Sequence, residues 1–561
     1  MIVLGLIARP DRPLVHDAAA CLAIDGTVVG ALEQERVSRR RHAGGEGPEG
    51  AVRVLLDACG LRASQIDAIA YGWSDAPADS SAVDAGLPHA VHVTDSLTET
   101  ILPTLAGELR NRDILFFDHH LCHAAHVYYL NPYPTADVLV TDGWGGDGST
   151  SLYHVDNGAF RLLERYDEQW SLGIMYEAAS CFAGLGRFGQ GKLMGLSSYG
   201  RVSDRRYLTF DPSDATFRLD RRLRGSLTYA DGWEGLSDHW LKAYETGVFP
   251  YLSSSGNIFD YASFAADVQM SVEDIGVAIA QRLRRLSTED TLLLSGGVVL
   301  NAHMNRRIAL ESGYPRVAGT VAPNDAGTVF GAALLAEALL GTPPRPLAGA
   351  ERIFFGPSVG TREIETALAR HHVAARAYEP DELRDRATQA LGRDQIVAWF
   401  DGRNEFGPRA LGARSLLASP TRRSTLDRLN RIKGREAWRP AALSLTSAGF
   451  RRLGMEPPVQ GLSEYMLCMH RVCESEAARA VAGIHVDGTT RGQWVPDGAG
   501  SFGALLAAVG ESAGLPALIN TSLNVKGEPM VLGPDRAVEL LTRSPDVDLL
   551  VMPPYLVSRS D

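Results

Sequence analysis

The sequence predicts an α/β protein with two domains, and three observations support this prediction. At 561 residues the chain is too long for one hydrophobic core. Up to about residue 340, short apolar runs alternate with helical stretches and glycine turns, as in an α/β domain. Residues 341–349, rich in proline and glycine, then separate this part from a second one with a clear apolar strand at residues 395–400. We therefore expect one domain over residues 1–345 and another over residues 350–561.

The bulk composition is that of an ordinary globular protein. The net charge is −12, with 22% charged and 45% hydrophobic residues, and no basic tail or block offsets the acidity. This argues against a nucleic-acid partner. The six cysteines are scattered without a Cys-x-x-Cys pair, so neither a disulfide framework nor a zinc finger is predicted. No apolar segment reaches membrane-spanning length, and the start of the chain lacks a charged leader region. We expect a cytoplasmic protein without a membrane partner. Its oligomeric state is open, and a homodimer is compatible with the sequence.

Residues 118–126 hold four histidines where an apolar strand passes into a helix. His119 and His123 stand four residues apart and so lie on one helix face, a spacing at which two imidazoles can bind one metal ion. Asp142 ends a later apolar run, and Asp325 lies in a turn that contains glycine. A pair of histidines at this spacing is more often structural when it stands alone. With two acids available, the nitrogen and oxygen set favours a site for iron, manganese or zinc.

The order of elements at the start of the chain is typical of a nucleotide-binding fold. A first strand is followed by a polar loop at residues 16–20 and by a hairpin with an Asp-Gly turn at residues 25–26. This order is similar to the beginning of actin/Hsp70/sugar-kinase-like folds. A second Asp-Gly loop at residues 142–143 repeats the pattern, as a duplicated fold would. Later a buried strand runs into Gly296 and Gly297, which would let the backbone approach a nucleotide closely.

Lysine is rare in this chain, which contains only four against a large excess of arginine. A lysine that is kept in such a chain is a candidate functional residue, because its compact ammonium charge cannot be replaced by the planar guanidinium of arginine. Lys192, Lys433 and Lys526 lie in glycine-rich or polar segments, as expected for lysines with a function. The alternative is that these lysines have been kept by chance.

These segments together resemble the carbamoyltransferases typified by the nodulation-factor, cephalosporin and tobramycin O-carbamoylating enzymes. The match runs nearly end to end, and the order of the motifs is more specific than any single one of them. The matching segments are residues 16–19, 33–38, 118–124, 191–196, 199–200, 295–298 with Asn301, 324–327, 405–412, 430–436 with Arg439, 487–489 with Arg491, and 520–529.

The resemblance implies an N-terminal actin/Hsp70-like (ASKHA) metal- and nucleotide-binding domain and a C-terminal YrdC-like α/β domain. The C-terminal domain would make carbamoyl adenylate from carbamoyl phosphate and ATP, with Mg²⁺ accompanying the ATP. The N-terminal domain is similar to that of the tRNA threonylcarbamoyl transferases. It would hold the adenylate on Fe²⁺, or on another divalent metal, and pass the carbamoyl group to a hydroxyl of a small molecule. The implied metal ligands are His119, His123, Asp142 and Asp325.

Carbamoyl phosphate and ATP bring many negative charges, which need lysine or arginine partners. We assign catalytic roles to Arg409, Lys433 and Arg491. Further residues are expected to bind the phosphates or the ribose, and these are Lys192, Arg435, Arg439, Ser522, Asn524 and Lys526. Arg435 and Arg439, taken singly, could instead be surface arginines, and Ser522 and Asn524 could serve a turn or a cap.

In the first domain Gly296, Gly297 and Asn301 would line the adenosine pocket. His16 is the candidate base for the acceptor hydroxyl, since a neutral imidazole titrates close to working pH. A histidine that only hydrogen-bonds its own loop is the alternative. Asp17 is expected to serve this loop or a bound magnesium. For His120 and His126 we expect a role in packing or in support of the metal ligands.

Three loops are candidates for shaping the acceptor pocket: residues 8–15, 74–88 and 219–257. The acceptor itself is expected to be a secondary metabolite, for example an aminoglycoside or a glycosylated macrolide antibiotic. The abundance of arginine and alanine is typical of a high-GC bacterium, where such tailoring enzymes are common. A tRNA threonylcarbamoyl-transferase-like enzyme and a non-catalytic nucleotide-binding scaffold are the alternatives. A hydrogenase maturation factor would need zinc-finger cysteine pairs, which the chain lacks.

Overall fold

The computed structural model describes residues 1–8, 16–73, 89–90, 100–110, 112–146, 148–223, 232–248, 256–345, 347 and 349–559. Residues 9–15 and 74–88, and residues 224–231 and 249–255 of the third candidate loop, lie outside the described residues. The described strands form three large sheets and one two-stranded ribbon, β10 (Leu208–Asp211) with β11 (Thr216–Leu219).

The first sheet has the strand order β3-β2-β1-β4-β6-β5. Its strands are β1 (Ile2–Ile7), β2 (Ala19–Ile24), β3 (Thr27–Glu33), β4 (Ala68–Tyr71), β5 (His89–Ala90) and β6 (Asp113–Phe116). Strands β1, β2 and β3 form an antiparallel meander, and β4 and β6 run parallel to β1. The predicted hairpin turn is confirmed, because Asp25 (φ 49°) and Gly26 (φ 82°) both adopt the left-handed conformation that such two-residue turns require.

The second sheet repeats this pattern with the order β13-β12-β7-β8-β9. Its strands are β7 (Thr135–Thr141), β8 (Thr150–Asp156), β9 (Ala159–Tyr166), β12 (Thr291–Ser295) and β13 (Arg316–Ala318). Again three antiparallel strands come first, and two later strands join the first of them in parallel. Apart from the short edge strand β5, the two sheets have the same topology, which is what a duplicated fold requires and what the paired Asp-Gly loops predict.

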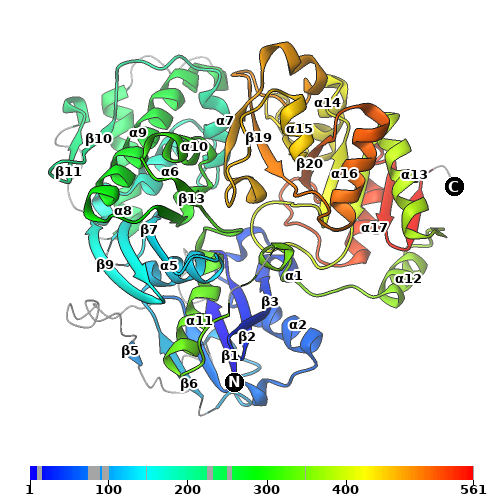
Figure 1. The fold of residues 1–561 in the computed structure, drawn as a ribbon, viewed down its shortest axis with the longest axis horizontal. Coiled ribbons are helices and arrows are strands. Elements are labelled where there is room, and N and C mark those ends of the chain that lie inside the picture. Colours follow the sequence, from blue (N-terminus) through cyan, green and yellow to red (C-terminus); the bar gives the residue numbers. More distant parts are fainter. Residues whose placement is uncertain are drawn as a thin grey trace.

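Helices α5 (His119–Tyr129) and α11 (Thr328–Leu339) lie next to each other between these two sheets (Figure 1). Their backbones approach very closely, since a Cβ on Gly331 would overlap the carbonyl oxygen of Cys122. A Cβ on Gly5 of β1 would likewise overlap the carbonyl of Val329 in α11. The other helices of this half are α1 (Gln34–Ser38), α2 (Glu49–Cys59), α6 (Leu172–Phe182), α7 (Gln190–Ser197), α8 (Gly232–Val248), α9 (Ala262–Leu286) and α10 (Ala302–Glu311).

The C-terminal part is built on a mixed sheet with the order β14-β22-β21-β15-β16-β20-β17-β19-β18. The predicted strand at residues 395–400 is present as β15 (Val397–Phe400). The other strands are β14 (Arg376–Ala377), β16 (Arg414–Ala418), β17 (Ala442–Leu445), β18 (Met469–Arg471), β19 (Thr489–Trp494), β20 (Ala517–Ser522), β21 (Leu549–Met552) and β22 (Tyr555–Ser558). Its helices are α12 (Thr361–Arg370), α13 (Pro380–Gly392), α14 (Arg423–Ile432), α15 (Ser447–Arg452), α16 (Gly500–Ala513) and α17 (Pro534–Arg543).

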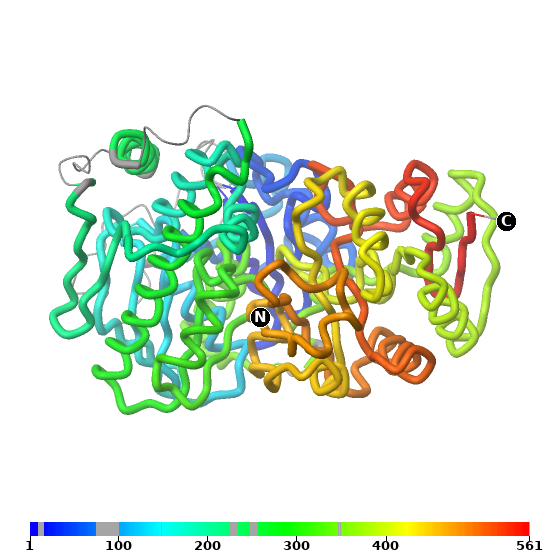
Figure 2. Tube along the Cα trace, turned by 90° about the horizontal axis from the view of Figure 1, so that it is seen from above, coloured from blue at the N-terminus to red at the C-terminus, as the bar shows by residue number. Residues whose placement is uncertain are grey.

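The two parts share apolar packing. In the view of Figure 2 the green helices and the yellow-to-red C-terminal part lie on opposite sides of the molecule. Phe406 of the C-terminal part packs edge-on against Phe330 of α11, with ring centroids 4.9 Å apart. Leu462 and Leu467 belong to the same buried cluster as Phe330. The C-terminal part is therefore joined to the N-terminal one by a continuous core, while the boundary between residues 345 and 350 stays a prediction. Within the described residues, every helix is too short or too polar to cross a membrane.

Gly331→Ala is expected to lower the unfolding temperature, because the added methyl group must displace the backbone of α5. Overpacking of this kind typically costs about 1–3 kcal/mol. The matched control is Gly392→Ala at the end of α13, where no atom lies within 4 Å of the added Cβ. Differential scanning calorimetry of both variants is the measurement. Equal unfolding temperatures for the two would contradict the close α5–α11 contact.

A candidate metal centre and a cation cluster

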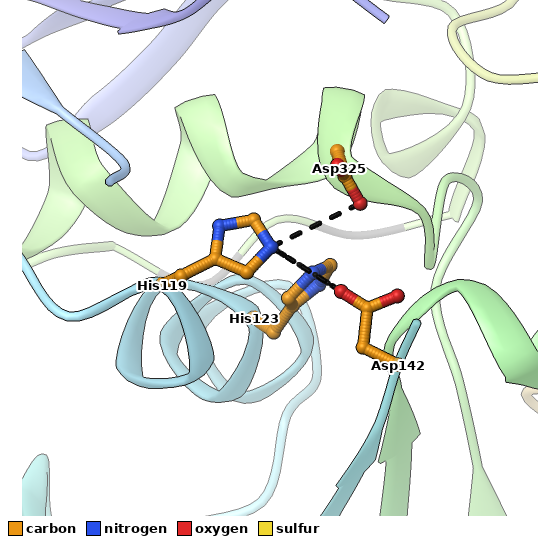
Figure 3. A group of neighbouring side chains, drawn as sticks. All are labelled: His119, His123, Asp142 and Asp325. Carbon is orange, nitrogen blue, oxygen red and sulfur yellow. Dashed lines mark hydrogen bonds and ion pairs between the residues drawn. The ribbon is translucent and has the colours of Figure 1, made fainter. Parts of the chain in front are cut away.

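Four side chains converge beside α5 (Figure 3). The four are His119 and His123 from α5, Asp142 after β7, and Asp325 in the turn before α11, and their ligand atoms all lie within 4.8 Å of one another. The Nε2 atoms of His119 and His123 are 3.2 Å apart. Oδ2 of Asp142 is 3.2 Å from the first and 3.3 Å from the second. The structure thus brings together the whole ligand set that the sequence predicts.

Local structure aims these ligands. Asp118 caps α5, because its side chain accepts a hydrogen bond from Leu121 N at 2.7 Å, so the helix begins at His119. Oδ1 of Asp142 accepts hydrogen bonds from Gly143 N (2.8 Å) and from Gly297 N (2.9 Å). These two bonds leave Oδ2 of Asp142 to face the imidazoles.

The protonation of the group suits a divalent cation. The carbonyl of Gly72 can only accept, so the Nδ1 that lies 2.9 Å from it carries the proton of His119, and Nε2 offers a lone pair when the ring is neutral. Burial would raise the pKa of Asp142, but His119 and His123, when their rings are protonated, hold it well below its usual range through hydrogen bonds and charge. Burial and the charge of Asp142 raise the pKa of Asp325. One cation between these side chains would be bound by two imidazole lone pairs and two carboxylates at once. The donor set therefore fits a divalent metal.

His120 and His126 lie outside this group, as expected. Nδ1 of His120 is 2.7 Å from the hydroxyl of Ser151, and Nε2 of His126 is 3.0 Å from the hydroxyl of Thr320. Burial lowers the pKa of both rings well below 6.5, so both are neutral. They act in the packing of α5, where His126 stacks on the ring of Phe330 with centroids 4.9 Å apart.

His16 and Asp17 lie at the edge of the metal group. Nδ1 of His16 is 3.2 Å from Oδ2 of Asp17, which also accepts a hydrogen bond from Asn324 Nδ2 at 2.9 Å. Asn324 is the neighbour of the candidate ligand Asp325 in the chain. Asp17 therefore serves its loop, one of the two roles expected for it. Burial would lower the pKa of His16, but the charge and hydrogen bond of Asp17 outweigh burial and raise the pKa to about 9. The pKa of His16 therefore lies above the near-neutral value that the sequence analysis expects.

A second group, which we call the cation cluster, consists of five side chains in the C-terminal part: Arg409, Lys433, Arg435, Arg439 and Arg491. Burial lowers the pKa of each of them, and repulsion from other members of the cluster lowers it further in all of them except Arg439. The pKa values of Arg435 and Arg491 are each lowered to about 10. Within the described part of the chain, the buried atoms Arg409 Nε, Arg435 Nη2 and Arg491 Nε have no hydrogen-bond partner. Buried donors without partners, on groups that repel one another, are the features of an anion site.

Neighbouring polar residues line this cluster. Lys433 Nζ donates to the carbonyl (2.7 Å) and hydroxyl (2.9 Å) of Ser522 and also bonds Asn524 Oδ1. The exposed Lys526 packs beside Gly434, the residue after Lys433. From the N-terminal half, Lys192 Nζ lies 3.2 Å from Glu436 Oε1. The structure thus brings Ser522 and Asn524 to Lys433 of the cluster and places Lys192 and Lys526 beside chain neighbours of its members.

Gly296, Gly297 and Asn301 have structural partners that the sequence argument missed. At Gly296 (φ 97°) a Cβ would overlap the carbonyl of Thr141, so glycine is needed for the turn that carries Gly297 N to Asp142. Asn301 caps α10 through Met304 N (3.2 Å) and pairs its amide with that of Gln269. Their place in an adenosine pocket stays a prediction.

The matching segment at residues 33–38 had no assigned role in the sequence argument. In the structure, Arg36 donates to the carbonyl of Gly407 at 2.6 Å and binds Glu33 at 2.7 Å. Gly407 lies two residues before Arg409, so this buried ion pair holds the loop of the cation cluster. One sign of this role is visible in the sequence, since Arg36 lies close to two glutamates in a segment that matches the family. Its partner Gly407 lies 371 residues away and could not be predicted.

The fold and these two groups define an α/β protein with one candidate site for a cation and one candidate site for anions. Comparison of the sequence with family models gives two matches: "Carbamoyltransferase N-terminus" over residues 99–334 and "Carbamoyltransferase C-terminus" over residues 388–559. The chain belongs to the carbamoyltransferase family and is a transferase enzyme.

Its relatives include named O-carbamoyltransferases. The chain is 29% identical to the 3'-hydroxymethylcephem-O-carbamoyltransferase of Amycolatopsis lactamdurans, over 92% of each chain. It is 28% identical to nodulation protein NolNO of Sinorhizobium fredii, over 97% of this chain and 79% of that protein. Among solved structures, full-length HypF in a phosphate- and nucleotide-bound form is 15% identical, over 61% of this chain and 56% of that one, with a TM-score of 0.36. So distant a likeness gives no basis for comparing sites.

His119→Ala and Asp325→Ala are each expected to abolish carbamoyl transfer and to lower the bound metal, because each removes one of four converging ligand atoms. The metal content of the purified variants, reconstituted with iron(II) and measured by mass spectrometry, is a readout independent of activity. His372→Ala, at an exposed histidine outside the group, should keep the wild-type content. Either variant with wild-type turnover and metal content would show that the assignment is wrong.

Proposed function

We propose that the protein is an ATP-dependent O-carbamoyltransferase that works in two steps. In the first, carbamoyl phosphate and water give carbamate and phosphate, and a carbamate oxygen attacks the α-phosphorus of ATP with loss of pyrophosphate. In the second, an acceptor hydroxyl attacks the carbamoyl carbon of the resulting carbamoyl adenylate, and AMP leaves. Carbamoyl phosphate, ATP, water and the hydroxyl compound are consumed, and phosphate, pyrophosphate, AMP and the O-carbamoyl product are formed.

The cation cluster is the observation that supports the first step. Carbamoyl phosphate and ATP both carry phosphate groups, and the unpartnered guanidinium donors of Arg409, Arg435 and Arg491 match their oxygen atoms. Lys433 is held in place by Ser522 and Asn524, so its amino group is already positioned when substrate arrives. Mg²⁺ would accompany the ATP. In this proposal residues 350–561 are a YrdC-like domain that forms the adenylate.

The histidine–aspartate group and His16 support the second step. In this proposal residues 1–345 form the ASKHA-type transfer domain, with Fe²⁺ or another divalent ion held by His119, His123, Asp142 and Asp325. A cation there would draw charge from the oxygen atoms of the bound adenylate. His16 would take the hydroxyl proton at one of its ring nitrogens, while Asp17 orients the ring. With a pKa of about 9, His16 is protonated at neutral pH, so it must lose this proton before it acts as the base.

The acceptor in this proposal is a hydroxyl of a secondary metabolite, such as an aminoglycoside or glycosylated macrolide antibiotic. The relatives support a small-molecule acceptor, since one of them is a 3'-hydroxymethylcephem-O-carbamoyltransferase. The composition supports it too, because the net charge of −12 offers no general attraction for a nucleic acid. We place the enzyme in the cytoplasm, where ATP is made.

The protein is expected to release pyrophosphate from ATP only when carbamoyl phosphate is present. The assay contains purified protein, ATP, Mg²⁺ and iron(II), with and without carbamoyl phosphate, and resolves AMP, ADP and pyrophosphate by chromatography. No acceptor is needed. Release of ADP, or release that does not depend on carbamoyl phosphate, would exclude the adenylating step.

Two variants are expected to separate the two steps. Lys433→Ala should slow adenylate formation about 100-fold or more, while transfer from supplied carbamoyl adenylate continues. His16→Asn should have the reverse effect, with transfer slowed about 100-fold or more. The control is Lys242→Ala, at an exposed lysine of α8 that lies outside the cluster. Equal loss of both steps in either variant would refute the division of labour between the two parts of the chain.

A further inference from the structure

A short segment of the N-terminal half, residues 33–46, contacts two loops of the C-terminal part, one that carries Arg409 and one that follows Ser522 and Asn524. Arg36 binds the carbonyl of Gly407, as described above. Arg39 donates to the carbonyls of Pro529 and Met530, each at 2.7 Å. The first contact holds the loop of Arg409, and the second holds the loop that follows Ser522 and Asn524. The segment therefore lies beside the loop of Arg409 and beside the loop that follows the residues holding Lys433.

The same segment reaches the other site through His42. Nδ1 of His42 is 2.9 Å from Oδ1 of Asp17, and its carbonyl accepts a hydrogen bond from Asp17 N at 2.7 Å. The backbone N of His42 donates to Oε2 of Glu35 at 2.8 Å. Asp17 in turn contacts His16. Adjacent residues, Arg41 and His42, are thus placed between the anion site and the transfer site.

The backbone around Arg41 is held in an uncommon conformation. Arg39 (φ 63°), His42 (φ 63°) and Ala43 (φ 44°) all lie in the left-handed region although none is glycine. Residues with a side chain rarely adopt this conformation, and they keep it where surrounding contacts fix them. The bonds of Arg39 and His42 supply those contacts on both sides. The position and direction of the Arg41 backbone are therefore set by the fold.

Arg41 differs from its neighbours in having no partner. Arg40 pairs with Glu46 at 3.0 Å, and Arg39 lies 3.4 Å from Glu528. Arg41 is exposed and makes no hydrogen bond or ion pair with any described residue. Its charge nevertheless acts on the cation cluster. The pKa values of Arg409 and Lys433 are lowered mainly by burial and by repulsion from neighbouring arginines. The charge of Arg41 lowers both pKa values further.

We propose that Arg41 is a phosphate-binding residue of the adenylate-forming site, supplied to the C-terminal cluster by the N-terminal half. A positioned cation that faces other cations is electrostatically unfavourable until an anion lies between them. The exposed guanidinium offers two parallel donors that fit a phosphate group. The inference rests on the proposed function, and it means that the C-terminal part does not contain a complete anion site. The phosphate belongs either to carbamoyl phosphate or to ATP.

The test compares Arg41→Ala with Arg40→Ala, a neighbouring exposed arginine whose partner is Glu46. In the pyrophosphate assay, Arg41→Ala should raise the KM for carbamoyl phosphate or for ATP about 10- to 100-fold, and Arg40→Ala should leave both near the wild-type value. A shift confined to one substrate identifies which phosphate Arg41 contacts. Transfer from supplied carbamoyl adenylate should be unchanged in both variants. Arg41→Lys should recover part of the loss, because it keeps the charge without the planar pair of donors.

A binding measurement separates this proposal from the proposed function. Isothermal titration with ATP and with inorganic phosphate gives dissociation constants that do not require turnover. If the wild-type protein shows no pyrophosphate release that depends on carbamoyl phosphate, the two-step function is wrong, and weaker binding of either probe by Arg41→Ala still supports the role of Arg41. If Arg41→Ala and Arg40→Ala bind both probes and turn over alike, Arg41 is not a phosphate ligand. Unchanged unfolding temperatures exclude misfolding as the cause of a loss.

Discussion

The close contact between α5 and α11 is the constraint on which the candidate metal centre depends. α5 carries His119 and His123, and the turn before α11 carries Asp325. Because Gly331 has no side chain, the backbone of α11 can lie against the carbonyl of Cys122. This contact brings ligand atoms from distant parts of the chain within 4.8 Å of one another, close enough for all of them to bind one ion. A change in the helix crossing would separate them without altering any ligand, since packed interiors deform little.

The molecule contains one cluster of negative side chains and one of positive side chains. In each cluster the like charges repel one another when no ligand is bound. Asp142 and Asp325 lie close together in the interior of the N-terminal half, whereas Arg409 and Arg491 repel each other in the C-terminal part. In a low-dielectric environment such repulsion is strong. A bound ligand of the opposite charge therefore stabilises each group more than it would at the surface. The shared apolar core keeps both groups assembled. Membership of the carbamoyltransferase family is consistent with one site for a cation and one for anions.

Features governed by local rules were predictable. The Asp-Gly turn at residues 25–26, the helix that begins at His119 and the strand near residue 397 all follow from patterns within a few residues. The expectation for His120 and His126 was also met, because buried histidines beside hydroxyl groups stay neutral. The pKa of His16 was not foreseen, since it depends on how Asp17 lies beside the ring. Nor was the capping role of Asn301, whose amide pairs with Gln269 on another helix.

The sequence by itself determined which residues could bind a metal ion and which could bind phosphates, because side-chain chemistry and helical spacing are local properties. It also determined that His119 and His123 share one face of a helix. Only the tertiary structure decided that Asp142 and Asp325 meet them, that Arg36 and Arg39 hold loops of the C-terminal part, and that the two parts share one core. Apart from the contact of Asp142 with His119, these contacts join segments hundreds of residues apart. They arise from the burial of apolar surface and the packing of whole elements, which no local pattern encodes.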